Sequence, residues 1–213
     1  MPDSRLDLIC CTVVDGALAT LGSVPTRGAK ATLPWGTVPS AAESLDSAAT
    51  RLARAVLGRA PAWMAQIGAF TDLASHPSGA TLSIAYAVVV PTGTEAPTGH
   101  GWHRVAPTKA FAEHQQRLVR AAVTVLRNRM DIDPITFRLL PPQFTLTELQ
   151  GLYELLLGRR LHKASFRRAL QAAHLIEPLD EWRSEGPGRP AQLFRYSPQR
   201  QRRTRSLRFE LLD

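Results

Sequence analysis

Cysteine is nearly absent from this sequence. Only Cys10 and Cys11 occur, and adjacent residues on a strand point to opposite faces of a sheet, so we do not expect a disulfide between them. Two cysteines also cannot supply a four-ligand zinc site without histidines. We therefore expect buried thiols on a strand, no bound metal or cofactor, and a cytoplasmic protein.

Long hydrophobic runs are missing as well. The longest apolar candidate, residues 84–90, has the length of a buried strand and falls well short of the roughly 20 residues that span a bilayer. The first residues do not show the basic and then apolar pattern of a secretory signal. We therefore expect no association with a membrane.

Acidic residues are scarce relative to basic ones. The chain of 213 residues has 26 Lys and Arg against 18 Asp and Glu, a net charge of +8. Residues 1–140 have a net charge of +3, and the much shorter segment 141–213 has +5. This concentration of positive charge favours a polyanionic partner, although a merely basic soluble surface would give the same numbers.

Residues 1–140 have the mixed patterns of an α+β domain. The apolar stretches 6–14 and 80–90 have the composition of strands. Residues 44–57 and 111–129 instead place their apolar side chains at helical spacing. We therefore expect a mixed sheet with two helices over this first domain.

The segment 134–144 is the expected seam between two domains. Because Pro141 and Pro142 prevent a helix from running through it, we expect it to be extended. Thr145 and Glu148 then have the spacing of a capping box, in which each side chain bonds the backbone amide of the other residue. A helix is therefore predicted to begin directly after Thr145.

The second domain, residues 141–213, has the order of elements of a winged helix-turn-helix. A second helix is predicted at 163–173, followed by two strands within 175–196. Such a domain usually carries a third helix. Either the helix at 111–129 packs beneath the other two, or a short helix is hidden in the seam.

The second helix and the hairpin carry the candidate DNA contacts. If Phe166 and Leu170 face the core, the basic and polar side chains around them face outward and reach bases and phosphates. The expected contacts are Lys163, Ser165, Arg167, Arg168, Arg189 and Arg195. Arginine donors match guanine or phosphate, and serine bonds either. Taken alone, the basic pair on the helix would also fit an ordinary solvated face.

Several fragments strongly resemble the NrtR family of Nudix-related transcriptional regulators. The most telling are FTLTELQ, FRR and GRPA, within LLPPQFTLTELQGLYELLLGRRLHKASFRRAL and GRPAQLFRY, and the resemblance extends upstream through WHRVAPTKAFAEHQQRLVRAAVTVLR and MAQIGAFTD. It implies a Nudix-like mixed-sheet sandwich that senses a small molecule, followed by a winged helix that binds double-stranded DNA. Members are usually dimeric repressors, and many respond to nucleotides such as ADP-ribose, whereas others regulate sugar catabolism.

The Nudix motif itself is degenerate. A working motif begins with Gly, five residues, Glu and seven residues, and it ends with Arg-Glu-hydrophobic-x-Glu-Glu-x-Gly. In this sequence six residues separate Gly36 from Glu43, one more than the motif has, and Arg51 matches the arginine. The three later glutamates are replaced by Leu52, Ala55 and Val56. These side chains offer no oxygen ligand to Mg²⁺. We therefore expect no diphosphate hydrolysis, and a domain that serves as a sensor, a dimerisation module, or both.

Four residues of the first domain are candidate effector contacts: Trp35, Arg51, Tyr86 and His114. Trp35 would stack on a base or sugar, or simply edge the core. Arg51 would meet a phosphate, or form an ion pair with Glu43. Tyr86 lies in a strand and also fits the core, and His114 matches a histidine in the family's AFDH-like segment.

Two other classes of function stay open at this point. The first is a diverged nucleotide hydrolase that has recruited acids elsewhere, such as Glu95 or Glu113. The second is a protein-interaction module whose basic face binds an acidic partner. Magnesium-dependent turnover would favour the first, and the absence of any preference among DNA sequences would favour the second.

Overall fold

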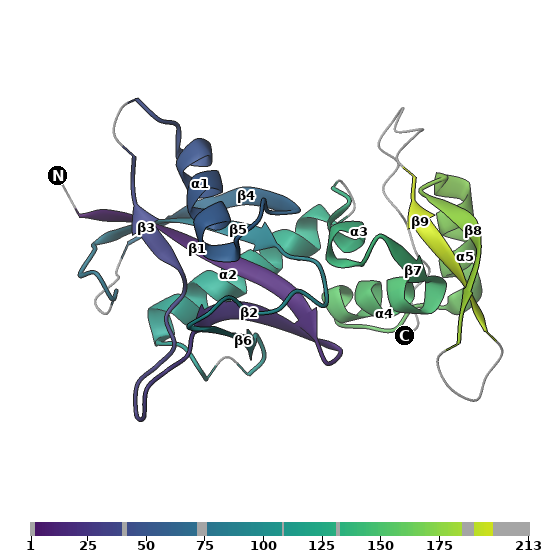
Figure 1. Ribbon diagram of the computed structural model, residues 1–213, viewed down its shortest axis with the longest axis horizontal. Helices are drawn as coiled ribbons and strands as arrows, with labels where there is room; N and C mark the ends of the chain where they lie inside the picture. Colours follow the sequence, from purple (N-terminus) through teal and green to yellow (C-terminus); the bar gives the residue numbers. More distant parts are fainter. Residues whose placement is uncertain are drawn as a thin grey trace. The chain divides into compact units, whose positions relative to one another are not determined.

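The computed structural model describes residues 3–39, 42–71, 76–107, 109–130, 133–184 and 190–197. The chain divides into two compact units, unit 1 (residues 1–126) and unit 2 (residues 127–213) (Figure 1). The expected α+β fold class is confirmed, with a mixed sheet in the first unit and a winged helix in the second. The division between residues 140 and 141 that we expected stays a prediction.

Unit 1 is built on a mixed sheet of six strands. Their bounds are β1 Ser4–Val14, β2 Ala17–Ser23, β3 Trp35–Thr37, β4 Trp63–Phe70, β5 Leu82–Val89 and β6 His100–Arg104. The order is β4-β5-β1-β2-β6, and β3 pairs with β1. The two strands predicted from apolar composition are the parallel pair β1 and β5. They lie at the centre of the sheet, where both faces are covered, so nearly continuous apolar sequence is favoured.

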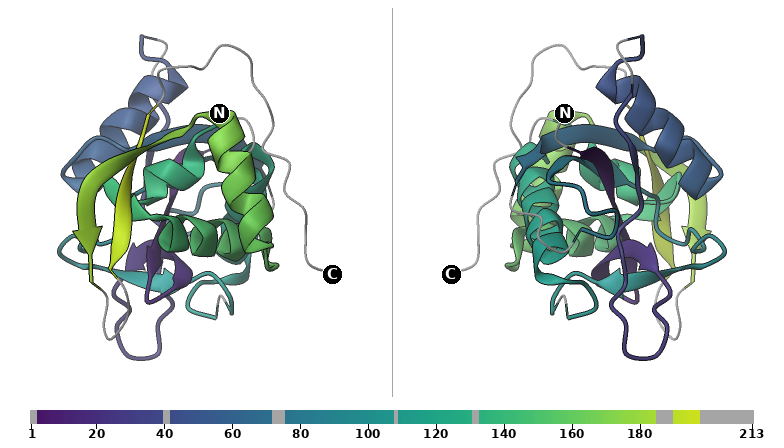
Figure 2. Two further views of the ribbon diagram at one scale, coloured as in Figure 1. Left: turned by 90° about the vertical axis from the view of Figure 1, so that its right-hand side faces the viewer. Right: turned by 90° about the vertical axis from the view of Figure 1, so that its left-hand side faces the viewer.

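Two helices, α1 Leu45–Leu57 and α2 Glu113–Arg129, cover opposite faces of this sheet (Figure 2). On one face the small side chains Ala48, Ala49 and Ala53 of α1 pack with Leu6 and Leu8 of β1. On the other face α2 buries its own apolar stripe, which includes Leu118, Val119 and Ala122. Side chains of β1 therefore alternate between an α1 side and an α2 side.

The described residues of unit 2 form three helices and a three-stranded sheet. The helices are α3 Ile135–Leu139, α4 Leu146–Leu157 and α5 Lys163–Ala173, and the strands are β7 Gln143–Thr145, β8 Ile176–Arg183 and β9 Ala191–Tyr196. The sheet order is β7-β9-β8. None of the helices in the described ranges has the length and hydropathy that a bilayer crossing requires.

The expectation that residues 134–144 are extended is wrong over α3. Pro134 lies at the N-terminal cap of this helix, where a proline ring is tolerated, and the later proline pair follows the helix instead of interrupting it. Phe137 of α3 stacks on Tyr196 of β9 with 4.5 Å between ring centroids, and it contacts Phe144 at 5.9 Å. The short helix hidden in the seam is therefore present, and it packs in the core of unit 2.

The predicted start of α4 is confirmed in detail. The Thr145 hydroxyl accepts a hydrogen bond from the Glu148 amide at 3.2 Å, and the Thr145 amide donates to the Glu148 carboxylate at 2.6 Å. The helix ends at Gly158, whose φ of 72° is a left-handed conformation that glycine adopts without strain. Phe166 and Leu170 of α5 are both buried against this helix layer, as predicted.

Candidate nucleic-acid interface and effector site

A polar groove of about 620 Å³ lies in unit 2, where α5, the N-terminus of α4 and the β8–β9 hairpin meet. Lys163 and Arg167, one helical turn apart on α5, both line it. Both side chains are exposed, and within the described ranges neither forms a hydrogen bond or an ion pair. Two of the six predicted DNA contacts are therefore brought together as free cations at a concave surface.

Ser165 does not face outward, and the prediction of its exposure is wrong. Its exposed fraction is 7%. The side chain of His162 caps α5 and accepts a hydrogen bond from the Ser165 amide at 3.4 Å, while Arg168 donates to the Ser165 hydroxyl at 3.3 Å. The capping side chain and the arginine therefore cover the first turn of the helix, and Ser165 supports α5 from within.

Of the other three predicted DNA contacts, Arg168 and Arg195 do not line the groove. Arg168 is exposed beside Ser165. Arg195 of β9 is exposed and forms an ion pair at 3.0 Å with Glu177, its cross-strand partner on β8. Such an exposed pair is worth at most about 1 kcal/mol, so a phosphate can displace the carboxylate. Arg189 lies outside the described residues. DNA contact by these three arginines stays a prediction.

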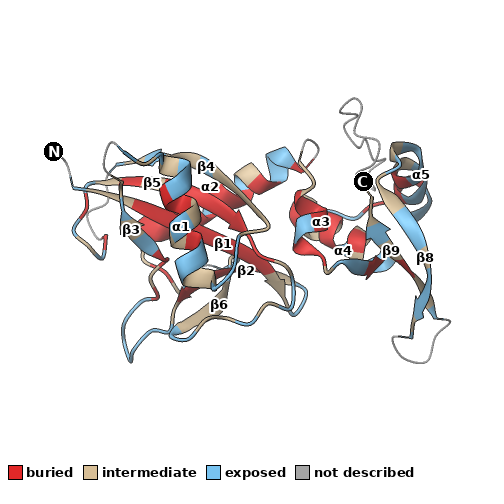
Figure 3. Cartoon of the chain, turned by 45° about the horizontal axis from the view of Figure 1, so that its top comes forward, coloured by how far each residue is buried: buried red, intermediate tan, exposed pale blue. Residues whose placement is uncertain are grey.

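Trp182 of β8 also lines the groove, and the sequence analysis did not single it out. Its exposed fraction is 56%. The outward side of α5 and most of β8 are exposed as well (Figure 3). No motif marks a tryptophan in a wing strand, so only the structure places it beside Lys163 and Arg167.

The four predicted effector contacts of unit 1 are divided between the two sides of the sheet. Arg51 of α1 donates to both carboxylate oxygens of Glu43, at 3.1 and 2.8 Å. These hydrogen bonds hold the pKa of Glu43 below its usual range. The arginine is therefore engaged in the ion pair that we considered as the alternative to a phosphate contact.

Tyr86 of β5 lies in the core on the α1 side. Its side chain is fully buried, and its hydroxyl donates to the Asp46 carboxylate of α1 at 2.7 Å. Burial is the largest cause that raises the pKa of Tyr86, and the Asp46 carboxylate raises it further. The core interpretation of Tyr86 is the one that the structure supports, because the ring is covered and the hydroxyl ties α1 to the sheet.

Trp35 and His114, in contrast, lie on the α2 side and meet through His76. The His76 ring contacts Trp35 edge-on at 5.7 Å and His114 at 6.1 Å between centroids. Trp35 is paired with Asp7 across β3 and β1, so both project from the same face. Leu6 and Leu8, the neighbours of Asp7, pack on the α1 side, so this face is the α2 side.

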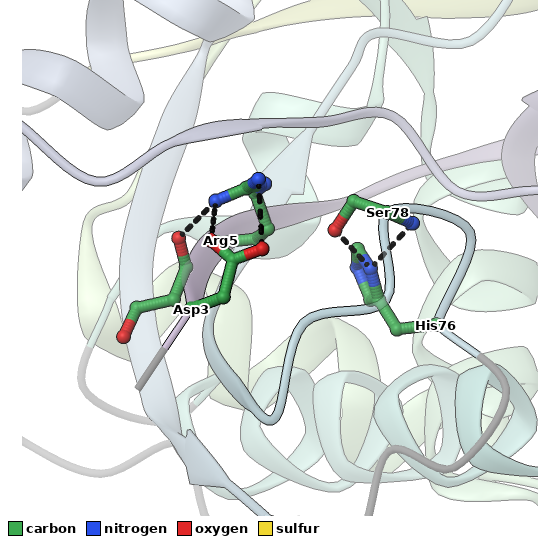
Figure 4. Close-up of polar contacts among 5 residues, drawn as sticks. Asp3, Arg5, His76 and Ser78 are labelled. Carbon is green, nitrogen blue, oxygen red and sulfur yellow. Dashed lines mark hydrogen bonds and ion pairs between the residues drawn. The ribbon is translucent and has the colours of Figure 1, made fainter. Parts of the chain in front are cut away.

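His76 is held in one tautomer by its neighbours. The amide of Ser78 lies 3.1 Å and its hydroxyl 2.7 Å from Nδ1 of His76 (Figure 4). Nδ1 accepts the amide hydrogen, so Nε2 carries the proton and donates to the buried Asp7 carboxylate at 3.3 Å. The Ser83 hydroxyl also donates to Asp7. This polar cluster carries no recognisable sequence motif.

His114 is the unusual member of this face. It is 7% exposed, and neither ring nitrogen has a hydrogen-bond partner within the described residues. Burial lowers the pKa of this imidazole. Buried polar atoms are nearly always satisfied in folded proteins, so an unsatisfied one points to a ligand, a water or a functional constraint.

In α1, which carries the degenerate Nudix motif, apolar residues occupy the three positions where a metal site would need acids. Leu52 and Val56 lie against the core cluster on the α1 side, and Ala55 is exposed. A Cβ added at Gly36 would come within 3.0 Å of Leu52, so the turn and the helix meet through an apolar contact. The positions of the three lost glutamates therefore serve packing or carry no ligand atom.

Comparisons with known proteins agree with this architecture. Residues 136–196 match the NrtR DNA-binding winged helix domain. The ADPR responsive transcriptional repressor NtrR of Acinetobacter baylyi is 40% identical over 90 residues, which are 42% of this chain and 35% of that protein. The matched stretch thus spans about a third of the length of this curated relative.

Two crystal structures share the fold over most of the chain. Shewanella oneidensis NrtR complexed with a 27mer DNA has a TM-score of 0.76 at 23% identity, covering 91% of this chain and 93% of that one. A MutT/nudix family protein from Enterococcus faecalis has a TM-score of 0.69 at 16% identity, covering 92% and 88%. The comparisons support the resemblance to the NrtR family in the C-terminal part of the chain, where residues 136–196 form a winged helix domain of the NrtR type, and the fold of these two crystal structures extends over most of the chain.

Proposed function

We propose that this protein is a DNA-binding transcriptional repressor whose Nudix-like domain binds a small effector and does not hydrolyse it. The observation that carries the proposal is the groove of unit 2, where Lys163 and Arg167 are exposed and have no partner in the part of the chain that the structure describes. The match to a DNA-binding winged helix domain supports it. The relative from A. baylyi is named a transcriptional repressor.

The recognition element is α5, the second helix of the helix-turn-helix. Lys163 is its first residue and Arg167 lies one turn later, so both side chains reach the same stretch of a major groove. An arginine bonds guanine or phosphate, and a lysine supplies a point charge to phosphate. We propose a homodimer whose two α5 helices read half-sites about 34–36 Å apart on an operator.

The effector site that we propose is the α2 side of the sheet, at Trp35 and His114. Trp35 is 38% exposed, and the guanidinium carbon of Arg5 lies 5.8 Å from the centroid of its ring. An aromatic face, a cation and an imidazole whose nitrogens have no partner among the described residues suit a nucleotide or a sugar derivative. Because the A. baylyi relative is named as ADPR responsive, ADP-ribose is the first compound to test. Its binding would favour one dimer arrangement and thereby change the affinity for DNA.

The absence of catalysis follows from the residues at the motif positions. Leu52, Ala55 and Val56 cannot bind Mg²⁺, so we expect no Mg²⁺-dependent turnover of nucleoside diphosphate derivatives. Turnover that is lost on changing Glu95 or Glu113 to glutamine would instead establish the diverged hydrolase.

The test of DNA binding is the dependence of affinity on salt. Removing one phosphate contact reduces the slope of log K against log salt by about 0.9, so Lys163→Ala with Arg167→Ala should make it shallower by about 1.8 for each subunit. Arg54→Ala removes one exposed positive charge from α1 and is the control, since a cation outside unit 2 should leave the slope unchanged. An unchanged slope in the double variant would remove the recognition-helix assignment, and equal binding to every DNA sequence would favour the protein-interaction module.

A further inference from the structure

The groove holds one feature that its cations do not explain. Trp182 is 56% exposed, and the other large hydrophobic side chains exposed within the described ranges are Val24 and Trp35, both in unit 1. Within the described part of unit 2, Trp182 is therefore the one large apolar side chain that is exposed. It lines the same groove as Lys163 and Arg167.

The strand on either side of Trp182 is fixed. Glu181 accepts a hydrogen bond from the Gln143 side chain at 3.3 Å. Arg183 donates to the Glu148 carboxylate at 2.7 Å and to the Gln143 carbonyl at 3.2 Å. Because residues 181 and 183 are both held towards β7 and the start of α4, the segment of β8 that carries Trp182 is held in place beside the groove.

The position across the strands is fixed as well. Trp182 is in register with Gln192 of β9, and the Gln192 side chain donates to the Leu179 carbonyl at 3.1 Å. Both Trp182 and Gln192 line the groove. The indole is therefore exposed on a strand that pairs with β9 and whose residues before and after Trp182 are held by side-chain hydrogen bonds. A partner then loses little conformational freedom in packing against it.

We propose that Trp182 is a DNA-contacting residue: its indole packs on the deoxyribose and base of the strand whose phosphates Lys163 and Arg167 hold. The inference rests on the proposed function and names a contact within it. Charge complementarity decides the occupant, because an exposed aromatic side chain in one groove with two cations that have no partner among the described residues matches a sugar-phosphate chain. The contact is uncharged, so it contributes affinity without releasing counterions.

The test compares Trp182→Ala and Trp182→Phe with the double variant of Lys163 and Arg167, by fluorescence anisotropy on DNA from upstream of the gene. Trp182→Ala should weaken binding roughly 10-fold or more, in the range of aromatic stacking on nucleotides, and leave the salt slope unchanged. Trp182→Phe should retain most of the affinity. Wild-type affinity in Trp182→Ala, or a salt slope as shallow as that of the cation variant, would overturn the proposal.

Intrinsic fluorescence gives a second readout. DNA should change the tryptophan emission of the wild type, and this change should be absent in Trp182→Phe and retained in Trp35→Phe. If Trp182→Phe retains the full emission change, the proposal is overturned. Since the side chain is exposed, the thermal unfolding of both Trp182 variants should match the wild type, which excludes misfolding as the cause of weak binding.

The two proposals fail in different ways. If the cation variant loses affinity and Trp182→Ala does not, the tryptophan contact is wrong and the DNA-binding function stands. If the wild type binds no DNA, or if the cation variant binds as the wild type does, the proposed function fails and the inference about Trp182 fails with it.

Discussion

The buried imidazole of His114 should make the stability of unit 1 depend on pH. Burial lowers its pKa below the usual value of about 6.5. The Arg117 guanidinium acts in the same direction, and the Asp7 carboxylate opposes it. His114 is 7% exposed and its ring nitrogens have no hydrogen-bond partners within the described residues, so burial outweighs the attraction of Asp7 for an added proton.

The sign and size follow from proton linkage. As the pH falls through about 6.5, the unfolded chain takes up a proton at residue 114 and the folded chain does not. The contribution to stability is therefore complete above the unfolded pKa and is lost as the pH falls towards the folded pKa. Between about pH 7.5 and about pH 5.5 the loss of unfolding free energy is at most about 1.4 kcal/mol. This is the linkage relation integrated over the interval for one group that titrates near 6.5 in the unfolded chain and stays neutral in the folded one.

Urea unfolding of the wild type and of His114→Leu at both pH values measures this loss. Trp35, Trp63 and Trp102 lie in unit 1, so tryptophan fluorescence follows mainly that unit. His114→Leu should lose up to about 1.4 kcal/mol less than the wild type over this interval, and His100→Leu, in β6, should behave as the wild type does. Equal pH dependence in the wild type and His114→Leu would refute the reasoning.

Two substitutions and one labelling experiment test the fold. Thr145→Ala removes the cap of α4 and should lower the free energy of unfolding by about 1 kcal/mol in thermal denaturation. No change would mean that the capping box is not formed in solution. Tyr86→Phe removes the hydrogen bond to Asp46 and should lower the free energy of unfolding by about 1 kcal/mol in urea. Full stability of this variant would mean that the hydrogen bond does not hold α1 on the sheet. Cys10 and Cys11 are fully buried, and burial raises the pKa of the Cys11 thiol to about 12. A thiol-reactive dye should therefore label them only after unfolding. Rapid labelling of the folded protein would contradict their burial.

Local rules account for the parts of unit 2 that the sequence predicted well. The cap at Thr145 and the end of α4 at Gly158 depend on residues within a few positions of each other, so spacing alone reveals them. The same rules predict an extended seam and leave a short helix within it only as an alternative, because proline usually ends a helix. Pro134 instead lies at the cap of α3, where its missing amide costs nothing.

Contacts between polar side chains could not be predicted from apolar periodicity. Ser165 is buried because the capping side chain of His162 and the side chain of Arg168, three residues away on either side, close over it. His76 bonds Asp7 across 69 positions of sequence. No spacing rule connects His76 with Asp7, so only the fold shows which candidate effector contacts share one face.

The central claim is that this protein reads a DNA sequence. The most direct measurement is fluorescence anisotropy of the purified protein with the DNA upstream of its own gene, against a scrambled duplex, at near-physiological salt. The account predicts a specificity ratio of roughly a thousandfold or more, as sequence-reading proteins show, and a change in affinity when ADP-ribose is added. Equal weak binding to both duplexes, repeated over all DNA flanking the gene and its neighbours, would contradict it.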